Sequence, residues 1–555
     1  MTNASVAHPD SSARPTIEKS DYLSIGLIVL AALVVGAPGI TQGGLGWSDA
    51  PNHVFDGIFV YEFIRQWPID APRAWAEQFY LRYPALGIVV YYPPGFAVAE
   101  AAMFALLGVN IVSARLTVLL FAVGACLLMY LLGRRWFDRP TGLFAALLLA
   151  TCPHGLLWAN DIMLEWPATF WMLVAVYCYQ SARDTRRARW DVLLGAAIVM
   201  AFMTKQTAGI ILPVLALHAM MQADRRRFLL RPSLLASIAG AASIIGAYIL
   251  ITHSYTALPS QLLRPSFDLS GMLHWPAEIL GWPLLPVALL GLLTLAWRPD
   301  RGPRGLLLIW FVAWMVFSLS IAAKEPRYLF FSIPPLAFAS ARFMLAAADD
   351  VYRAISWKTD APRMTLLAAL VVVQLVLSRR HFTGHLPTHA GAVSELARRS
   401  DADLVLVDAL RDGQFIFDVY QNAEARERII PLRASKFLYA RAAREKYDYQ
   451  QFVEAPQDIV ALLNRYGVRF IVIESAYPRT PYADADPPPR KMLRELLTSD
   501  DRFAQIGSWP MACGDPAWDG VALQLFEYVA CPPRTEKRIR LSIPAMGREV
   551  EFELP

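Results

Sequence analysis

Long apolar segments are the feature that most constrains this 555-residue chain. A helix that crosses a membrane needs roughly 20 mostly apolar residues. Segments of that kind are residues 22–40, 113–133, 141–157, 162–180, 190–204, 207–222, 233–252, 277–297, 304–323, 327–347 and 364–379. They explain why 55% of the residues are hydrophobic and only 18% are charged, against about 25% charged in soluble domains. A purely soluble enzyme is therefore excluded, and a net charge of +5 is too small to indicate binding to nucleic acid.

Lysine and arginine are distributed unevenly over the connecting loops, and this asymmetry predicts the orientation of the chain. One set of loops holds 17 Lys and Arg in 51 residues, whereas the alternate set holds 6 in 90. The basic, cytoplasmic set comprises 133–140, 181–190, 223–232, 298–304 and 348–363, and the outer set comprises 41–94, 154–161, 253–276 and 324–327. We therefore expect a multi-pass plasma (inner) membrane protein with a cytoplasmic tail (1–21), an uncleaved first anchor, and residues 380–555 outside.

A further apolar stretch, residues 95–108, is shorter and carries Glu100 at its middle. The segment 22–40 should end outside, and the segment 113–133 should run inward to the basic Arg134. The stretch 95–108 then cannot be a full crossing. We expect a re-entrant or juxtamembrane helix on the outer side; the alternative is a twelfth span, with the N-terminus outside or another segment misread.

Residues 380–555 have the pattern of a separate α/β domain. Leu404–Val407 and Phe470–Ile473 are short apolar runs typical of buried strands. The second run follows a helical pattern that Gly467 ends, and alternate apolar residues near the C-terminus predict another strand. Residues 480–490 are expected to form a loop. Cys513 and Cys531, the two cysteines of this domain, could be bridged outside the cytoplasm or could be independent thiols.

The first outer loop combines carboxylates with a histidine. On a helix, Asp49, His53 and Asp56 fall at positions i, i+4 and i+7, and therefore on one face. The alternative is structural, because Ser48 or Asp49 just before Pro51 is a good N-cap for the following helix.

Other ionisable residues lie at the ends of predicted spans, where burial makes them candidates for function. Asp161 and Glu165 are one helical turn apart where a span emerges; the alternative is a solvated helix end. Lys205 occupies the break between two spans, and it could instead be a snorkelling lysine. Lys324 and Arg327 form a tiny outer loop that goes against the charge asymmetry of the other loops, which favours binding of an anion.

Together these residues supply two kinds of chemistry. Carboxylates suit a general base, and lysine and arginine suit a phosphate. A phosphate-bearing lipid presented from the bilayer, with an acceptor that arrives from outside, would use both sets. No metal is required for a phosphate that already pairs with cations, although the face formed by Asp49, His53 and Asp56 could bind a divalent cation.

Several short motifs follow one another in a characteristic order. They are the acidic outer loop at Asp49, Tyr91-Tyr92-Pro93-Pro94-Gly95-Phe96, Ala114-Arg115-Leu116, Gly133-Arg134-Arg135-Trp136-Phe137, Asp161 after Cys152-Pro153, the lone Lys205, and Pro326-Arg327-Tyr328 with Pro334-Pro335. Over roughly residues 20–345 the chain resembles the GT-C-type integral membrane glycosyltransferases, in particular the branch of protein O-mannosyltransferases and bacterial aminoarabinose transferases (glycosyltransferase family 39 and relatives). Two positions depart from that pattern: Ala50 follows Asp49 where the family often has Glu, and Tyr92 stands where Lys or His is common.

The resemblance implies an all-α, GT-C-like membrane domain over residues 22–379, followed by the α/β domain. It also implies transfer of a sugar, with inversion, from a polyprenyl-phosphate donor on the outer face, with Asp49 as the catalytic base. On this hypothesis Asp161 orients Asp49 or the acceptor, and the donor phosphate is held by Lys205, Arg327 and Lys324. The substrate site is completed by His53, Asp56, Tyr92, Glu165 and Tyr328.

The acceptor on this hypothesis is a glycan, a lipid or a protein, and membrane lipids surround the enzyme. Two other functions would use the same residues differently. A transporter or flippase of a lipid-linked anion would use the outer charges as a binding site, but neither charged midplane residues nor an internal repeat is evident in the sequence. The chain could also be a non-catalytic scaffold of the cell envelope.

Overall fold

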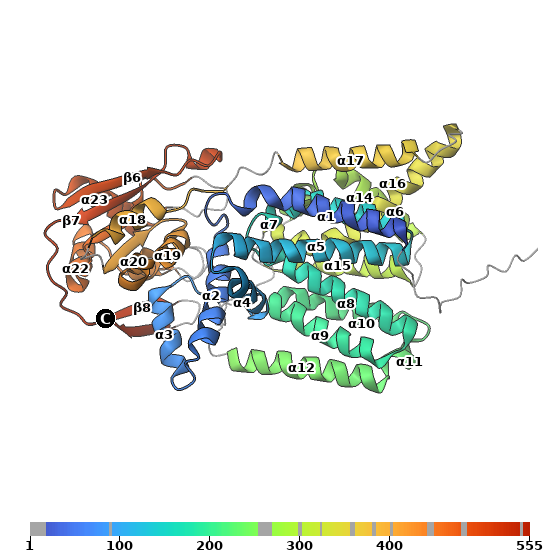
Figure 1. Ribbon diagram of the computed structural model, residues 1–555, viewed down its shortest axis with the longest axis horizontal. Helices are drawn as coiled ribbons and strands as arrows, with labels where there is room; N and C mark the ends of the chain where they lie inside the picture. The colour runs from blue at the N-terminus through green and yellow to red at the C-terminus, as the bar shows by residue number, and fades with distance from the viewer. Residues whose placement is uncertain are drawn as a thin grey trace, which may run out of the picture.

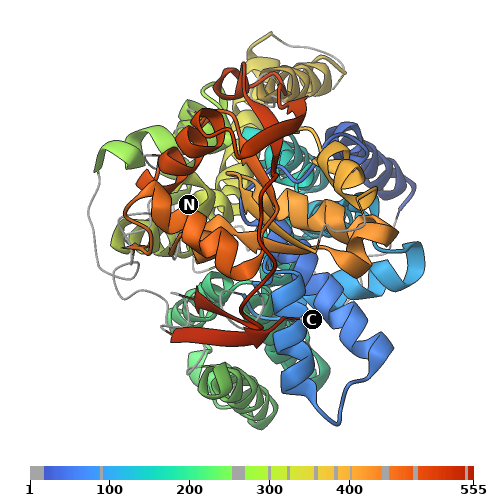
Figure 2. The same cartoon turned by 90° about the vertical axis from the view of Figure 1, so that its left-hand side faces the viewer.

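The computed structural model describes residues 18–87, 92–252, 269–297, 302–321, 325–355, 361–379, 385–399, 403–440, 449–478, 486–543 and 548–554. A bundle of helices forms one end of the molecule and an α/β domain forms the other (Figure 1). Viewed from the α/β end, this C-terminal domain lies over the ends of the helices, with α2 (Ala50–Gln66) and α3 (Pro72–Arg82) beside it (Figure 2).

The helical part runs from α1 to α17. Its elements are α1 (Lys19–Ile40), α2, α3, α4 (Gly95–Leu107), α5 (Ile111–Trp136), α6 (Arg139–Thr151), α7 (Pro153–Ala159), α8 (Glu165–Thr185), α9 (Ala188–Thr204), η1 (Gln206–Ile210), α10 (Ile211–Met220), α11 (Arg225–Leu229), α12 (Pro232–Thr252), α13 (Leu269–Leu280), α14 (Leu284–Trp297), α15 (Pro303–Ser320), η3 (Pro326–Ser332), α16 (Ile333–Ile355) and α17 (Ala361–Arg379).

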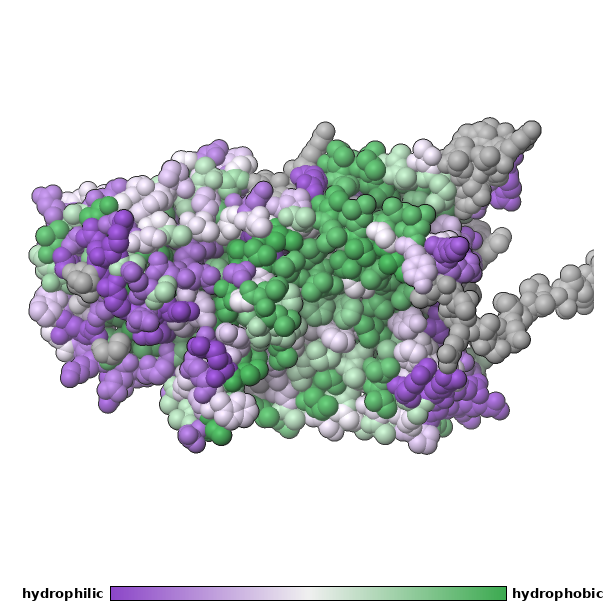
Figure 3. All heavy atoms as spheres, in the orientation of Figure 1, coloured by the Kyte–Doolittle hydropathy of each residue, from purple (hydrophilic) through white to green (hydrophobic). Residues whose placement is uncertain are grey.

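Each of the eleven apolar segments overlaps a helix, and Figure 3 shows a hydrophobic band between two hydrophilic ends. Within the described residues, five helices are long and apolar enough to cross a membrane, or up to seven if two bent pairs each count as one span. The five are α1, α5, α12, α15 and Pro326–Val351, which joins η3 to most of α16. The chain is thus a multi-pass membrane protein by its helices, while the number of eleven crossings stays a prediction.

The bends in the bundle have local causes. At the junction of α6 and α7 the chain turns by 65°. Cys152 is extended there (φ −66°, ψ 155°), because the ring of Pro153 disfavours the helical conformation of the residue before it. Lys205 is also extended (φ −153°, ψ 120°), so the chain breaks between α9 and η1. This break places the Lys205 side chain inside the bundle.

Helix α4 corresponds to the apolar stretch 95–108. It has 13 residues, which is short of the roughly 20 that a span requires. It packs against α2 and α5 near the end of the bundle that faces the C-terminal domain (Figure 1). This placement fits a non-crossing outer helix, which remains a prediction.

The C-terminal domain contains a five-stranded sheet of order β2-β1-β5-β7-β6. Strands β2, β1 and β5 are parallel, and β7 and β6 are antiparallel additions. Its elements are α18 (Ala390–Ala397), β1 (Leu404–Asp408), α19 (Asp412–Gln421), α20 (Ala423–Arg428), β2 (Ile430–Arg433), α21 (Ala434–Phe437), β3 (Tyr439–Ala440), β4 (Gln450–Gln451), α22 (Pro456–Tyr466), β5 (Phe470–Glu474), α23 (Pro488–Ser499), β6 (Phe503–Pro510), η4 (Pro516–Trp518), β7 (Ala522–Tyr528), β8 (Arg538–Ile543) and β9 (Arg548–Glu553).

Most of the local expectations for this domain are confirmed. The two apolar runs are β1 and β5, the alternating tail is β9, and Gly467 ends α22 in the left-handed conformation (φ 63°). The predicted loop at 480–490 is wrong at its end, because α23 begins at Pro488. Proline suits the first turn of a helix, where its missing N–H would have no partner. Residues 480–485 of that loop lie outside the described part of the chain.

The two cysteines of this domain do not form a bridge. Cys513 packs with the hydrophobic cluster on one face of the sheet, whereas Cys531 packs with the cluster on the other face. Both are free thiols in the structure. The alternating side-chain direction of a strand creates these two faces, and the sheet separates the cysteines.

Candidate active site

An ion pair joins the first outer loop to η3, a short helix that comes late in the sequence of the helical bundle. The Oδ2 atom of Asp49 lies 2.5 Å from Nη1 of Arg327, and Nε of the same guanidinium lies 2.6 Å from Oε2 of Glu325. Asp49 occupies the N-cap position of α2, but its side chain makes no capping hydrogen bond. The capping interpretation of Asp49 is therefore wrong, because the carboxylate is engaged by Arg327 instead.

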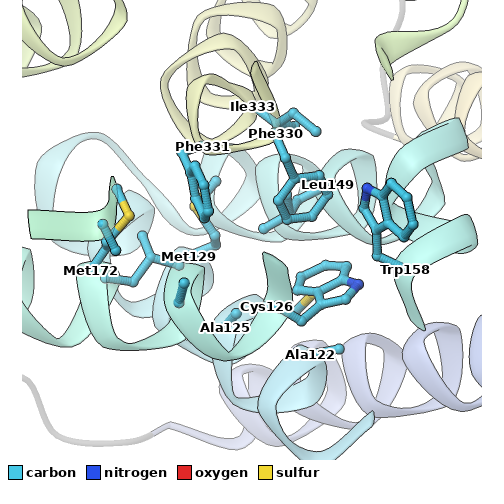
Figure 4. Close-up of a cluster of buried hydrophobic side chains, with 14 of the residues drawn as sticks. Ala122, Ala125, Cys126, Met129, Leu149, Trp158, Met172, Phe330, Phe331 and Ile333 are labelled. Atoms are coloured by element: carbon cyan, nitrogen blue, oxygen red, sulfur yellow. The ribbon is translucent and has the colours of Figure 1, made fainter. Parts of the chain in front are cut away.

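Packing in the bundle fixes the position of Arg327. This residue lies in the first turn of η3, which begins at Pro326. Farther along the same short helix, Phe330 and Phe331 are fully buried. Figure 4 shows them in a cluster with Met129, among other side chains. Two anchored phenylalanines leave little freedom to the turn that carries the guanidinium, because cores are close-packed.

A second ion pair lies deeper in the bundle. The Nζ atom of Lys205 is 2.5 Å from Oε1 of Glu165, and both residues are buried, at 8% and 0% exposure. The ammonium also lies 5.8 Å from the ring centroid of Tyr328 and 5.6 Å from that of Phe331. The snorkelling interpretation of Lys205 is wrong, since the side chain points into the protein and not toward solvent. The solvated-end interpretation of Glu165 fails for the same reason.

His53 and Tyr92 connect the two ion pairs. The ring centroids of His53 and Tyr92 are 4.4 Å apart, and the Tyr92 hydroxyl hydrogen-bonds with Asp49. His53 is within electrostatic range of both ion pairs, since Asp49 and Glu165 each favour its protonation. The pairs thus belong to one cluster, formed by residues from α2, the segment before α4, α8, the break after α9, and η3.

Burial and charge pairing set the protonation states of this cluster. Burial opposes ionisation of Asp49, but the Arg327 guanidinium outweighs it and holds the pKa of the carboxyl at about 2. Burial lowers the pKa of His53 to about 4, against the pull of the Asp49 charge. Burial together with the Asp49 carboxylate raises the pKa of the Tyr92 hydroxyl well above 10. Near neutral pH Asp49 is therefore an anion, while His53 and Tyr92 are neutral.

Asp161 lies in a neighbouring group. Its Oδ1 atom accepts a hydrogen bond from its own neighbour, the Ile162 amide, at 2.8 Å, and Arg115 is the charge that most favours its ionised form. Burial nevertheless raises the pKa of Asp161. The backbone of Gly46 passes so close that an added Cβ would lie 2.9 Å from Oδ2 of Asp161. No hydrogen bond between Asp161 and Asp49 occurs in the described structure, so Asp161 contacts the loop that carries Asp49 and not the carboxylate itself.

Asp56 points in another direction. Its Oδ1 atom accepts a hydrogen bond from the Gly87 amide at 2.7 Å. Glu100 of α4 lies close by, fully buried, and burial together with the charge of Asp56 raises its pKa well above the usual value. Asp56 therefore belongs to the packing of α2 on α4. Asp49, His53 and Asp56 do not converge on one cation, and the described residues contain no group of three or more His, Cys, Asp and Glu that could hold a metal ion.

The structure brings together Asp49, His53, Tyr92, Glu165, Lys205, Arg327 and Tyr328, while Lys324 lies outside the described residues. Sequence reasoning missed Glu325, although it lies in the same tiny loop as Arg327. It also gave no role to Arg411, a residue of the C-terminal domain. Asp161 and Asp49 both favour the charged form of Arg411 despite its burial, so the C-terminal domain places a cation beside the site.

Comparison with known proteins supports a single class. Residues 92–251 match the family model described as dolichyl-phosphate-mannose-protein mannosyltransferase. The chain is 30% identical over 311 residues to undecaprenyl phosphate-α-4-amino-4-deoxy-L-arabinose arabinosyl transferase 2 of Pseudomonas fluorescens, a match that covers 50% of each chain. The corresponding transferase of Pseudomonas aeruginosa strain LESB58 is 32% identical over 265 residues, or 42% of this chain and 46% of that one. The chain thus spans about half the length of the curated relatives it matches.

Solved structures extend the likeness of fold to nearly the whole chain. ArnT from Cupriavidus metallidurans bound to undecaprenyl phosphate aligns with a TM-score of 0.57 at 17% identity, over 93% of this chain and 100% of that one. The archaeal oligosaccharyltransferase AglB from Archaeoglobus fulgidus aligns with a TM-score of 0.55 at 15% identity, over 82% and 69%.

The fold is therefore similar to that of ArnT and AglB, with a helical bundle followed by a C-terminal α/β region. The expected resemblance to the GT-C-type branch of protein O-mannosyltransferases and aminoarabinose transferases is confirmed by the family model and the curated relatives.

Proposed function

We propose that this protein is a membrane glycosyltransferase that moves a sugar from a polyprenyl-phosphate donor to an acceptor on the extracytoplasmic face. The observation that carries the proposal is the convergence of Asp49 with Arg327, 278 residues apart in the chain, beside the Glu165–Lys205 pair. One cluster thus contains a carboxylate that can take a proton and two cations that can hold a phosphate. The names of the relatives support such a donor, since they include undecaprenyl phosphate and dolichyl phosphate.

In the structure the cations are neutralised by the protein's own carboxylates. A donor phosphate that enters must take over contacts that Asp49 and Glu165 now make with Arg327 and Lys205. The planar guanidinium of Arg327 can bind a phosphate through two N–H groups, and the Lys205 ammonium acts as a point charge. Because the pairing with Arg327 is what holds the pKa of Asp49 low, transfer of Arg327 to the phosphate raises that pKa and makes Asp49 a stronger base.

The chemical step follows from this arrangement. The Asp49 carboxylate accepts the proton of an acceptor hydroxyl, and the hydroxyl oxygen forms a bond to the anomeric carbon of the donor sugar. The bond between that carbon and the phosphate oxygen breaks at the same time, with inversion, and the lipid phosphate leaves with the electron pair. Arg327 and Lys205, already in place, stabilise the charge that develops on the phosphate. Neutral His53 and Tyr92 lie beside the two ion pairs, with their ring centroids 4.4 Å apart.

The test is a transfer assay with purified protein in lipid nanodiscs. The donor probes are undecaprenyl phosphate-α-4-amino-4-deoxy-L-arabinose and a polyprenyl-phosphate mannose, each labelled in the sugar, with an extract of cell-envelope lipids and glycans as acceptor. We expect release of lipid phosphate together with transfer of label to an acceptor. Movement of intact donor across the bilayer without release of lipid phosphate would indicate a flippase and contradict the proposal. Binding of donor with neither event would indicate a non-catalytic scaffold and contradict the proposal.

A further inference from the structure

The loop that carries Asp49 is held from the membrane side by one buried arginine. Arg115 of α5 is fully buried, and its Nη1 atom donates to the carbonyls of Gly39 at 2.6 Å and Gln42 at 2.8 Å. Its Nη2 atom donates to the carbonyl of Gly44 at 2.6 Å. These bonds fix the path of the chain between α1 and α2, since hydrogen bonds from a charged donor are among the stronger ones in proteins.

The C-terminal domain holds the same loop from the opposite side. The carbonyl of Leu386 accepts a hydrogen bond from the Gly44 amide at 2.6 Å, and Oε1 of Gln414 accepts one from the Leu45 amide at 2.5 Å. The approach is so close that a Cβ added to Gly44 would lie 2.5 Å from Oε1 of Gln414. Four residues after Leu45 the chain reaches Asp49.

The orientation of the Gln414 amide is fixed by its second contact. Its Nε2 atom donates to Oδ1 of Asp418 at 2.9 Å, one turn farther along α19, and Oδ2 of Asp418 accepts from the His389 amide at 2.6 Å. Gln414 and Asp418 are 2% and 7% exposed. Because the Leu45 N–H can only donate and Nε2 is taken up by Asp418, the amide presents its oxygen to Leu45.

Helix α19 is itself anchored on α2. The ring of Phe417 packs edge-on against Phe55, and the hydroxyl of Tyr420 donates to Oε1 of Glu62 at 2.8 Å. The backbone of Gly413 lies against Pro51, where an added Cβ would be 2.4 Å from the proline ring. Gln414 is therefore fixed with respect to the helix that begins directly after Asp49.

We propose that Gln414 is a positioning residue for the proposed glycosyl transfer: through it the C-terminal domain fixes the 43–46 loop and thereby the Asp49 carboxylate. The inference rests on the proposed function for its catalytic consequence, but its structural content is independent of that function. A displacement of about 1 Å in a reacting group can lower turnover on the order of 100-fold, so a single amide at this place can matter for rate.

The first experiment compares two glutamine substitutions on the same helix. Gln414→Leu keeps the approximate size and removes both hydrogen bonds. Gln421→Leu, the matched control, removes an exposed amide bond to the Val109 carbonyl (3.1 Å), also between the C-terminal domain and the rest of the chain. We expect Gln414→Leu to lower kcat about 10- to 100-fold with the donor KM changed less than about threefold. The control should stay within about twofold of wild type.

Amide hydrogen exchange reports directly on how firmly the loop is held, and it does not depend on an activity assay. The peptide that covers residues 41–49 should exchange faster in Gln414→Leu than in wild type, and should be unchanged in Gln421→Leu. Equal exchange of this peptide in all three proteins would overturn the inference, whether or not the protein proves to be a transferase. A raised donor KM with unchanged kcat would also overturn it, because it would assign Gln414 to donor binding.

A double variant that exchanges the amide of Gln414 and the carboxylate of Asp418 tests whether restored hydrogen bonds restore activity. Gln414→Glu alone places a second carboxylate against Asp418, and Asp418→Asn alone loses the carboxylate that accepts from two N–H groups. In the double variant the new glutamate accepts from Leu45 and from the new asparagine, whose oxygen accepts from the His389 amide, so every hydrogen bond is restored. We expect the double variant to recover at least tenfold in kcat over the weaker single variant. Additive losses would contradict a role in positioning.

Discussion

The Asp49 carboxylate of the first outer loop meets the Arg327 guanidinium of η3, with 2.5 Å between Oδ2 and Nη1. Asp49 is at the N-cap position of α2 and yet makes no capping bond. Its carboxylate instead pairs with Arg327, and a phosphate can compete with Asp49 for that guanidinium. Asp49 is therefore held by a side chain distant in the sequence and not by the helix that it precedes.

Replacement of Asp49 by asparagine should abolish most of the activity and leave the fold intact. General-base assistance typically contributes a factor of about 10²–10⁴, so turnover in the transfer assay should fall by roughly that much. Binding of donor should persist, because Arg327 then loses only the Asp49 carboxylate that competes with the phosphate and keeps its contact with Glu325. Full transfer activity in Asp49→Asn would end the proposed mechanism.

Replacement of Arg327 should affect use of the donor in a graded way. Arg327→Lys keeps the charge but loses the planar fork, whereas Arg327→Ala loses both. We expect the donor KM to rise in the order wild type, Lys variant, Ala variant, with kcat falling in parallel as the leaving phosphate loses stabilisation. Steady-state kinetics at saturating acceptor measures both. If the Lys and Ala variants are equally impaired, charge is not the property that matters at this position.

The Glu165–Lys205 pair should dominate stability in this region. Removal of one partner leaves an uncompensated buried charge, which costs about 3–5 kcal/mol. Glu165→Gln should therefore lower the melting temperature strongly in detergent, and Glu165→Gln combined with Lys205→Met should recover part of the loss. The matched control is the exposed Arg73–Glu77 pair, with side chains 78% and 43% exposed, where Glu77→Gln should cost less than about 1 kcal/mol. Similar losses in the two pairs would contradict the buried placement.

Acidification should weaken the fold through His53. Its pKa is about 4 in the folded protein, and about 6.5 is usual for an unfolded chain. Between these values the unfolded state binds a proton that the folded state rejects, so this contribution is complete above pH 6.5 and is lost as the pH falls toward 4. The free energy of unfolding of wild type should therefore fall on acidification by up to about 3 kcal/mol more than that of His53→Gln. Parallel curves for the two proteins would show that His53 is not held neutral by burial.

A side chain added at Gly46 should lower activity, because the space around this residue is already filled. In Gly46→Ala the new Cβ would lie 2.9 Å from Oδ2 of Asp161 and 3.1 Å from Nδ1 of His385, so either these side chains or the loop that leads to Asp49 must shift. We expect turnover to fall about tenfold or more. Gly26→Ala is the control, since nothing lies within 4 Å of the added atom there, and its activity should match wild type. An unimpaired Gly46→Ala enzyme would show that the Asp49 loop tolerates displacement.

The sequence by itself determined the elements that depend on local pattern. Long apolar segments predicted the helices of the bundle, and the apolar runs at Leu404 and Phe470 predicted two neighbouring strands. These predictions hold because a buried element must itself consist of apolar residues. The costly burial of ionisable groups singled out Asp49, Lys205 and Arg327 for the same reason.

Only the tertiary structure decided which groups meet. It paired Asp49 with Arg327 and not with its own helix, separated Asp161 from Asp49, and placed Cys513 and Cys531 on opposite faces of one sheet. It also brought Gln414 from the C-terminal domain to the backbone of Leu45, 369 residues away in the chain. Such contacts depend on how whole elements pack against one another. The sequence around each of the two contacting residues therefore does not indicate which residue it will contact.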